Sequence, residues 1–120
     1  MNIDETSPMS TAADVRRIVT SFPEVIEETI EDIPSFSVAG RMFARLRENE
    51  TVLAFRVRDI DEQDMLLMAE SQKYFITPSY EGRPIILVRL AHIDPEELTQ
   101  LLTDAWEIRA PEELKPMSST

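Results

Sequence analysis

Apolar residues recur with the period of an α-helix in three parts of the chain, over residues 11–23, 59–70 and 94–110. At the start of the first part, Thr11 and Asp14 form an acidic variant of a capping box. In the second part, an aspartate cap precedes a segment rich in methionine, and we expect those methionines to fill gaps in the core. These patterns predict three helices.

The third helix has the clearest start. Asp94 is a typical cap residue, Pro95 occupies the first helical position, and Glu97 is placed to reach back to the amide of the cap. Trp106 lies at helical spacing from several leucines, which indicates that it belongs to the core. Ala110 and the proline after it end the helix.

Alternating polar and apolar residues predict strands between the helices. Residues 41–47 and 52–58 alternate on either side of a polar turn and form the clearest hairpin. Residues 24–33 read as an acidic strand closed by Pro34, with a short extended piece after it, and residues 85–91 form a further strand. We therefore predict an α+β domain whose antiparallel sheet is covered on one face by helices.

A chain of 120 residues fits one domain, which we assign to residues 11–111, with flexible tails at 1–10 and 112–120. The sequence has no cysteine, so it offers neither a disulfide framework nor a thiolate metal site. Its N-terminus lacks the basic and apolar regions of a secretion signal, and no run of about 18 apolar residues occurs. We expect a cytoplasmic protein that does not bind membranes.

Positive charge is concentrated in the middle of an acidic chain. The sequence carries 12 lysines and arginines against 23 aspartates and glutamates, a net charge of −11. Residues 39–58 reverse this balance with five arginines and two acids. The overall charge argues against binding of nucleic acid through the field of the whole protein, but it leaves room for a local basic patch.

Strand periodicity would gather this positive charge on one side of the sheet. Side chains alternate between the two faces of a strand, so six of the seven arginines outside the helices could line the uncovered face, together with one aromatic residue. Arginine forms planar, bidentate contacts with phosphate and carboxylate groups. The candidate nucleic-acid-binding residues are Arg41, Phe43, Arg45, Arg47, Arg56, Arg58 and Arg89.

Three interpretations of such a face remain open. The arginines could pair with glutamates on neighbouring strands, namely Glu27, Glu31, Glu48 and Glu50, and merely keep the face soluble. They could instead bind an acidic protein partner or a second copy of the chain. They could also bind nucleic acid, with Phe43 as a stacking surface, and that binding would be weak and strongly dependent on salt.

No catalytic motif is present. His92 is the single histidine, and two glycines cannot build a nucleotide-binding loop, so we expect no enzymatic activity, no cofactor and no small-molecule substrate. The acidic runs at residues 24–32 and 59–64 lack the spacing of a calcium loop. A metal-binding function through these runs is the weakest alternative.

Several strings of the sequence resemble the MmcQ/YjbR family over about residues 12–111. The most specific is Gly40-Arg41-Met42-Phe43-Ala44, which resembles the glycine-basic-Met-Phe-Ala motif of the family. The segment Tyr74 to Gly82 resembles its aromatic-Thr-Pro loop, although Ser79 stands where many relatives have histidine. The resemblance implies an α+β fold similar to that of CyaY and frataxin, described as a double-wing motif, and DNA binding. Because fold alone does not establish function, DNA contact through the arginines remains a hypothesis, with protein interaction through the same face as the alternative.

Overall fold

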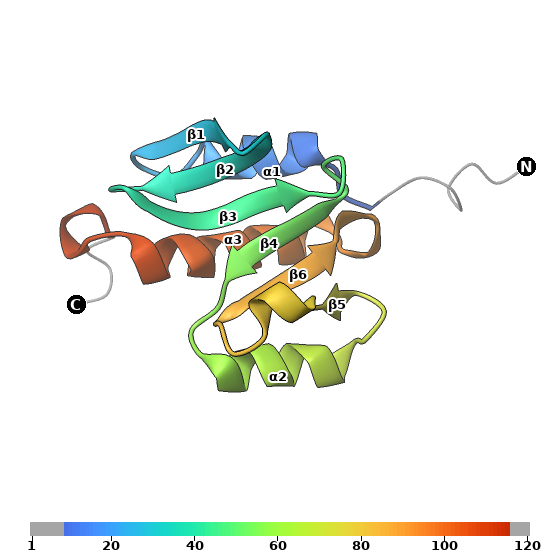
Figure 1. Ribbon diagram of the computed structural model, residues 1–120. Coiled ribbons are helices and arrows are strands. Elements are labelled where there is room, and N and C mark those ends of the chain that lie inside the picture. The colour runs from blue at the N-terminus through green and yellow to red at the C-terminus, as the bar shows by residue number, and fades with distance from the viewer. Residues whose placement is uncertain (1–8, 116–120) are drawn as a thin grey trace, which may run out of the picture.

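The computed structural model describes residues 9–115, which form a six-stranded antiparallel sheet and three α-helices (Figure 1). The strand order is β1-β2-β3-β4-β6-β5. The helices are α1 (Ala12–Val19), α2 (Ile60–Ala69) and α3 (Pro95–Arg109). The strands are β1 (Val25–Ile30), β2 (Ile33–Val38), β3 (Arg41–Arg47), β4 (Val52–Arg56), β5 (Tyr74–Phe75) and β6 (Ile85–Arg89).

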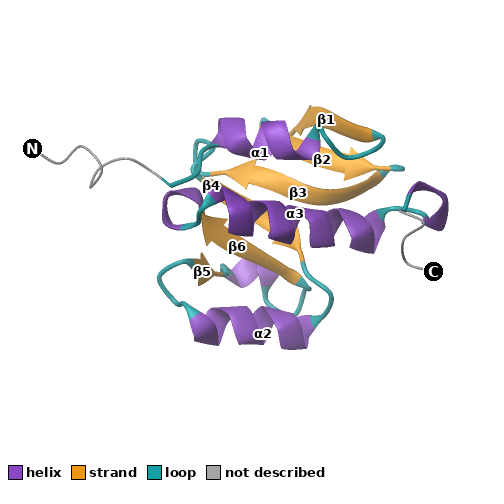
Figure 2. Cartoon of the chain, turned by 180° about the vertical axis from the view of Figure 1, so that it is seen from behind, coloured by secondary structure: helices purple, strands orange, loops and turns teal. Residues whose placement is uncertain are grey.

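Helices α1 and α3 lie side by side across one face of the sheet, whereas α2 lies beside β5 and β6 (Figure 2). The predicted α+β class, with helices on one face of an antiparallel sheet, is confirmed. Thr11, Asp59 and Asp94 cap the three helices through their side chains, as expected from the sequence. Helix α1 ends at Val19, about one turn before Pro23. No helix within residues 9–115 is both long and apolar enough to cross a bilayer.

The first four strands form a meander joined by short turns. The residues in the turn between β1 and β2, Glu31 and Asp32, both have positive φ, and so do Ala39 and Gly40 between β2 and β3. Positive φ at both central residues allows a two-residue turn to follow the twist of the strands. The prediction that Pro34 closes a strand is wrong, because Pro34 lies inside β2 opposite Thr29.

Strand β3 contains one extra residue where it pairs with β2. Phe36 lies opposite Ala44 and Ser37 lies opposite Met42, which leaves Phe43 as the unpaired residue of a β-bulge. A bulge changes the face to which the preceding residues of the strand point. The simple alternation predicted for residues 41–47 therefore holds only after Phe43.

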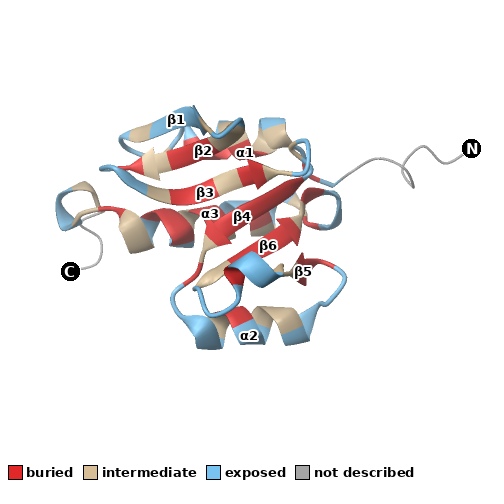
Figure 3. Ribbon diagram, viewed as in Figure 1, coloured by how far each residue is buried: buried red, intermediate tan, exposed pale blue. Residues whose placement is uncertain are grey.

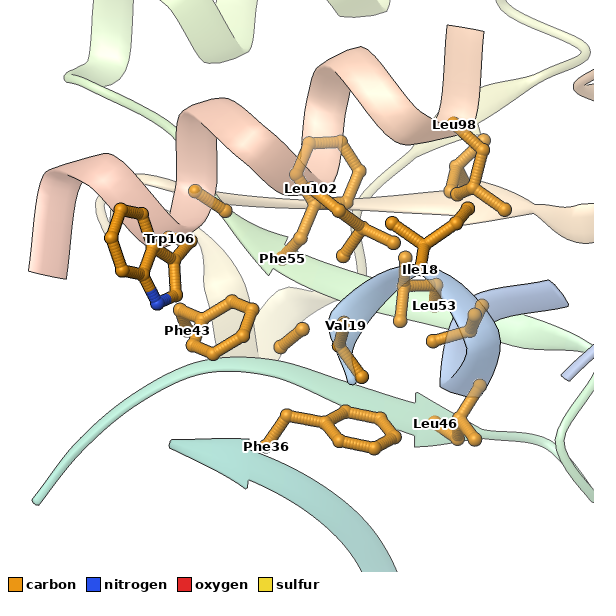
Figure 4. Packing of buried hydrophobic residues seen from close by; sticks show 14 of the residues in the cluster. Ile18, Val19, Phe36, Phe43, Leu46, Leu53, Phe55, Leu98, Leu102 and Trp106 are labelled. Carbon is orange, nitrogen blue, oxygen red and sulfur yellow. The ribbon is translucent and has the colours of Figure 1, made fainter. Parts of the chain in front are cut away.

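The bulge places Phe43 in the main core. Phe43 is 2% exposed and belongs to the cluster between the sheet and the helices. Buried residues gather on the central strands β3, β4 and β6 (Figure 3). The ring of Phe43 points toward α3, where Trp106 lies (Figure 4). Trp106 also contacts the ring of Phe22 and donates a hydrogen bond of 3.2 Å to the carbonyl of Pro23. The prediction of an exposed Phe43 is wrong, whereas the core position predicted for Trp106 is confirmed.

Helix α2 buries less of its apolar surface than its sequence suggests. Met65 and Met68 are 67% and 86% exposed, while Leu66 and Leu67 pack against the core. The prediction that the methionines fill the core is wrong because apolar residues occur on several sides of this helix, and only one side faces the sheet. Gln63 fixes that side by donating hydrogen bonds of 2.7 Å to the carbonyls of Arg83 and Ile85.

Described residues on both sides of the predicted domain, residues 11–111, also contact it. The backbone amide of Ser10 bonds to the carbonyl of Leu90, and its hydroxyl donates to the carbonyl of Ile93. After α3, a 3₁₀ turn over Glu112–Leu114 brings Leu114 against the core. The predicted tails at 1–8 and 116–120 lie outside the described residues.

A partly buried polar cluster joins α3 to the segment around β5. The Nζ atom of Lys73 lies 2.8 Å from Oε1 of Glu97 and 3.1 Å from a carboxylate oxygen of Glu70, and the hydroxyl of Tyr74 donates to Oε2 of Glu97 over 2.7 Å. The carboxylate of Glu97 therefore binds Lys73 and Tyr74, whereas the sequence predicted that it would bind the backbone amide of the cap residue Asp94. Burial alone would raise the pKa of Glu97, but hydrogen bonds from Lys73 and Tyr74 outweigh it and lower the pKa below the ordinary 4.5.

We predict that Glu97→Gln lowers the free energy of unfolding at pH 7 by about 1 kcal/mol. The loss is small for a charged hydrogen bond because Glu97 is partly exposed and solvent screens its interaction with Lys73. A carboxylate with a depressed pKa contributes stability above its ordinary pKa and loses it as the pH falls through the folded value. The difference from wild type should therefore shrink below pH 4.5. Urea denaturation followed by Trp106 fluorescence at neutral and acidic pH measures it. The matched control is Glu96→Gln, an exposed acid in the same helical turn; equal losses in both variants would contradict the prediction.

A second prediction concerns the bulge. Phe43→Leu should lower the free energy of unfolding by roughly 1–3 kcal/mol, because it removes ring atoms from a packed core. Urea denaturation of the variant against wild type provides the measurement. A change within about 0.5 kcal/mol, as is usual for surface substitutions, would show that Phe43 is not a core residue.

Candidate anion-binding surface

Four arginines lie on the face of the sheet opposite α1 and α3. Residues paired across antiparallel strands share a face. Arg45 lies opposite Ala54, Arg47 and Arg89 both lie opposite Val52, and Arg56 lies opposite Ile85. We call Arg45, Arg47, Arg56 and Arg89 the arginine face. These four of the seven candidate residues occupy the surface predicted for them.

Neutral groups orient the arginines of this face. Arg45 donates from Nε to the hydroxyl of Ser35 over 3.1 Å and from Nη2 to the carbonyl of Ile30 over 3.2 Å. Arg47 donates to the hydroxyl of Tyr80, and its guanidinium lies over the ring of the same tyrosine. These contacts restrict the side chains without removing their charge.

The other two arginines are held in the same way. The guanidinium carbon of Arg89 lies 4.2 Å from the ring centroid of Phe75, and Nη1 donates to the carbonyl of Gln72 over 3.0 Å. Arg56 donates from Nε to the carbonyl of Val57 over 3.2 Å. Stacking on Phe75 leaves the outer edge of Arg89 able to bind an acceptor.

Two of the four acids expected to neutralise this face bind elsewhere. Glu27 and Glu50 both form salt bridges with Arg16 of α1, at 3.1 Å and 3.0 Å. Arg16 donates hydrogen bonds to the carboxylates of Glu50 and Glu27, and these bonds raise the pKa of Arg16 above its ordinary value. Within residues 9–115, no residue of the arginine face forms a salt bridge. The interpretation that these arginines are paired with glutamates on neighbouring strands is wrong for the described chain.

Arg41 and Arg58 do not join the arginine face. Arg41 precedes the bulge and lies opposite Val38, a core residue, so it belongs to the side covered by the helices. Arg58 follows the end of β4 and lies 3.8 Å from Glu62 in a hollow that Asp104 and Glu107 also line. The predicted gathering of six arginines on one face is therefore wrong for these two, because the bulge and the end of the strand interrupt the alternation.

A pocket of about 280 Å³ opens beside the arginine face. Its guanidinium groups come from Arg45, Arg47, Arg56, Arg83 and Arg109, and Tyr80 and Ser79 contribute hydroxyls. No aspartate or glutamate lines it. Arg83 and Arg109 are not among the site residues predicted from the sequence. Arg83 lies in a turn and Arg109 is the last residue of α3, and neither position carries a local signal.

Arg109 has an unusual environment in this pocket. Its Nε atom is buried and has no hydrogen-bond partner within the described chain. Burial, followed by repulsion from Arg56 and Arg41, lowers the pKa of Arg109 below its ordinary value. An arginine in a protein cannot give up its proton, so the lowered pKa reflects a positive charge held where it is disfavoured.

Within residues 9–115, histidine and acidic side chains do not form groups of three or more that could hold a metal ion. His92 is exposed in a short 3₁₀ turn after β6. The side chains with the chemistry of a site are therefore the arginines, whose guanidinium groups bind phosphate, carboxylate and similar oxyanions.

Comparison with known proteins identifies the family of this chain. The model of the YjbR family matches residues 20–108, most of the described domain. The chain belongs to the YjbR family. The resemblance inferred from Gly40-Arg41-Met42-Phe43-Ala44 and the aromatic-Thr-Pro loop is thereby confirmed.

Proteins of three bacteria match most of the chain. The uncharacterized protein Rv2570 of Mycobacterium tuberculosis and the uncharacterized protein Mb2600 of Mycobacterium bovis are each 32% identical to it over 123 residues, which cover 88% of this chain and 93% of theirs. The crystal structure of Deinococcus radiodurans protein DR2400, which carries the domain DUF419, superimposes with a TM-score of 0.71 at 23% identity and covers 83% of this chain and 78% of that one. This structure supports the shared fold.

Proposed function

We propose that this YjbR protein is a non-enzymatic protein that contacts DNA through the arginine face. The observation that carries the proposal is the combination of oriented and unneutralised guanidinium groups on that face. A chain of net charge −11 has enough carboxylates to neutralise four arginines, yet Glu27 and Glu50 pair with Arg16. Within residues 9–115 the four arginines of this face form no salt bridge, which supports their availability to phosphate groups.

The chemistry of the face favours phosphate contact over the reading of bases. Arg45, Arg47, Arg56 and Arg89 supply forked donors, which position a protein on the nucleic-acid backbone and carry no sequence information. Phe43 is buried, and the rings of Phe75 and Tyr80 are already occupied by arginines. With no free aromatic ring among these residues for stacking, binding should be independent of sequence and weak, with a Kd of about 10⁻⁴–10⁻⁶ M at physiological salt.

We predict that the double variant Arg47→Gln/Arg89→Gln weakens DNA binding and flattens its salt dependence. Each phosphate contact to duplex DNA contributes about 0.9 to the slope of log affinity against log salt, so removal of two contacts should lower the slope by about 2. The measurement is fluorescence anisotropy of a short labelled duplex, titrated at several salt concentrations.

The matched control is Arg17→Gln/Lys115→Gln, which removes the same charge from residues outside the arginine face. This control should retain most of the affinity. Equal loss in both double variants would show that only total charge matters and would exclude a DNA site on this face. If the wild-type protein fails to bind DNA but binds an acidic peptide, and this binding is lost in Arg47→Gln/Arg89→Gln, the alternative of an acidic protein partner replaces the proposal.

A further inference from the structure

The pocket beside the arginine face exists because β3 and β4 separate. Their pairing ends at Ala44 and Phe55, whereas β3 continues back to Arg41 and β4 continues to Arg56 (Figure 1). The pocket lies at this separation and is lined by Met42 and Phe43 as well as by Arg56. The bulge bends β3 away from β4 at the same point.

The separation lets residues from both sides of the sheet reach one pocket. Tyr80 packs on the side of the arginine face with Val52 and Ala54, whereas Arg109 belongs to α3 on the opposite side. Both nevertheless line the pocket. Arg109 therefore adds a positive charge from the helical side of the sheet to the charge of Arg56 in the same pocket.

The positive charge in this pocket is uncompensated by protein groups. No carboxylate lines the pocket, and neither Arg56 nor Arg109 forms a salt bridge within residues 9–115. The Nε atom of Arg109 is buried without an acceptor. A buried donor without a partner destabilises the fold, and an anion bound in the pocket would offset the positive charge of this guanidinium group. The arrangement therefore calls for a compact anion of more than one negative charge.

We propose that the pocket binds a phosphate monoester, with Arg56 and Arg109 as its main ligands. A volume of about 280 Å³ lies just below the range of about 300–1,000 Å³ usual for ligand pockets, so the occupant is small. A monoester carries close to two negative charges at pH 7, whereas the internal phosphodiesters of DNA carry one each. The pocket shares Arg45, Arg47 and Arg56 with the arginine face, but binding of a monoester there does not require the DNA contact proposed above. The monoester can belong to a small phosphorylated molecule or to the phosphorylated end of a nucleic-acid strand, because both carry a terminal phosphate group.

The test is isothermal titration calorimetry with inorganic phosphate, ribose 5-phosphate and the diester dimethyl phosphate. We expect the wild-type protein to bind the first two with a stoichiometry of one and the diester more weakly. Arg109→Met keeps the apolar stem but removes the guanidinium, and it should weaken binding by about tenfold or more. Arg17→Met, which removes an exposed arginine on α1, should bind as wild type does.

Thermal unfolding gives a second readout that a merely structural arginine would not produce. Arg109→Met should raise the Tm in phosphate-free buffer, because it removes a buried Nε donor without a partner and the repulsion between Arg109 and Arg56. Phosphate should then no longer raise the Tm further. A lowered Tm without phosphate would assign Arg109 a structural role and overturn the proposal. So would absence of phosphate binding by wild type, equal binding by Arg109→Met, or equal affinity for dimethyl phosphate.

The source of the monoester is separated by one further arm. A 5′-phosphorylated dinucleotide that displaces ribose 5-phosphate and binds more tightly supports the site and assigns it to strand ends, whereas weaker binding supports it as a small-molecule site. Failure of duplex DNA to bind leaves these results unaffected, so the two proposals fail separately.

Discussion

The unpaired Phe43 in β3 controls the distribution of side chains over both faces of the sheet. Because strand side chains alternate, one extra residue reverses the direction of those before it. Phe43 consequently packs beneath α3, and Arg41 points to the helical side. After the bulge, Arg45 and Arg47 project from the opposite face. If β3 alternated regularly, Phe43 would share the face of Arg45 and Arg47, and its core position beside Trp106 would be empty.

The salt bridges add to this distribution of charge. Glu27 of β1 and Glu50 of the turn after β3 bind Arg16 of α1. Glu28, in contrast, lies opposite Ser35 and therefore on the side of Arg45. The arginines of the sheet are left with hydroxyls, carbonyls and aromatic rings as partners. A protein of strongly negative net charge thus keeps one positive region, which is oriented by neutral contacts and so remains available to an anion.

Local signals predicted most of the fold. The caps at Thr11 and Asp94 and the hairpin over residues 41–56 were readable because they depend on residues close in sequence. The bulge was not readable, since Met42, Phe43 and Ala44 are all apolar and either register would bury some of them. The burial of the methionines in α2 was predicted wrongly for a related reason. Apolar residues occur on several sides of this helix, and only its contact with the sheet shows which side is covered.

The candidate site was predictable only in part. The alternation of Arg45, Arg47, Arg56 and Arg89 with apolar residues indicated a shared face, and the register confirms it. The pocket required Arg109 to meet β3 and β4 across the core, a contact between residues far apart in sequence that no spacing announces. The uncompensated positive charge of the pocket can be inferred only after the structure shows which residues line it and that no carboxylate is among them.

The meander of the first four strands has a kinetic consequence. Strands β1 to β4 are joined by very short turns, so their pairing closes small loops and loses little chain entropy. Strand β6 pairs with β4 only after the intervening residues 57–84 have been brought back to the sheet. Folding should therefore begin in the meander and be limited by the docking of β6, because distant contacts form more slowly than local ones. The arginine face, which draws residues from both sides of that junction, is complete only when this last pairing has formed.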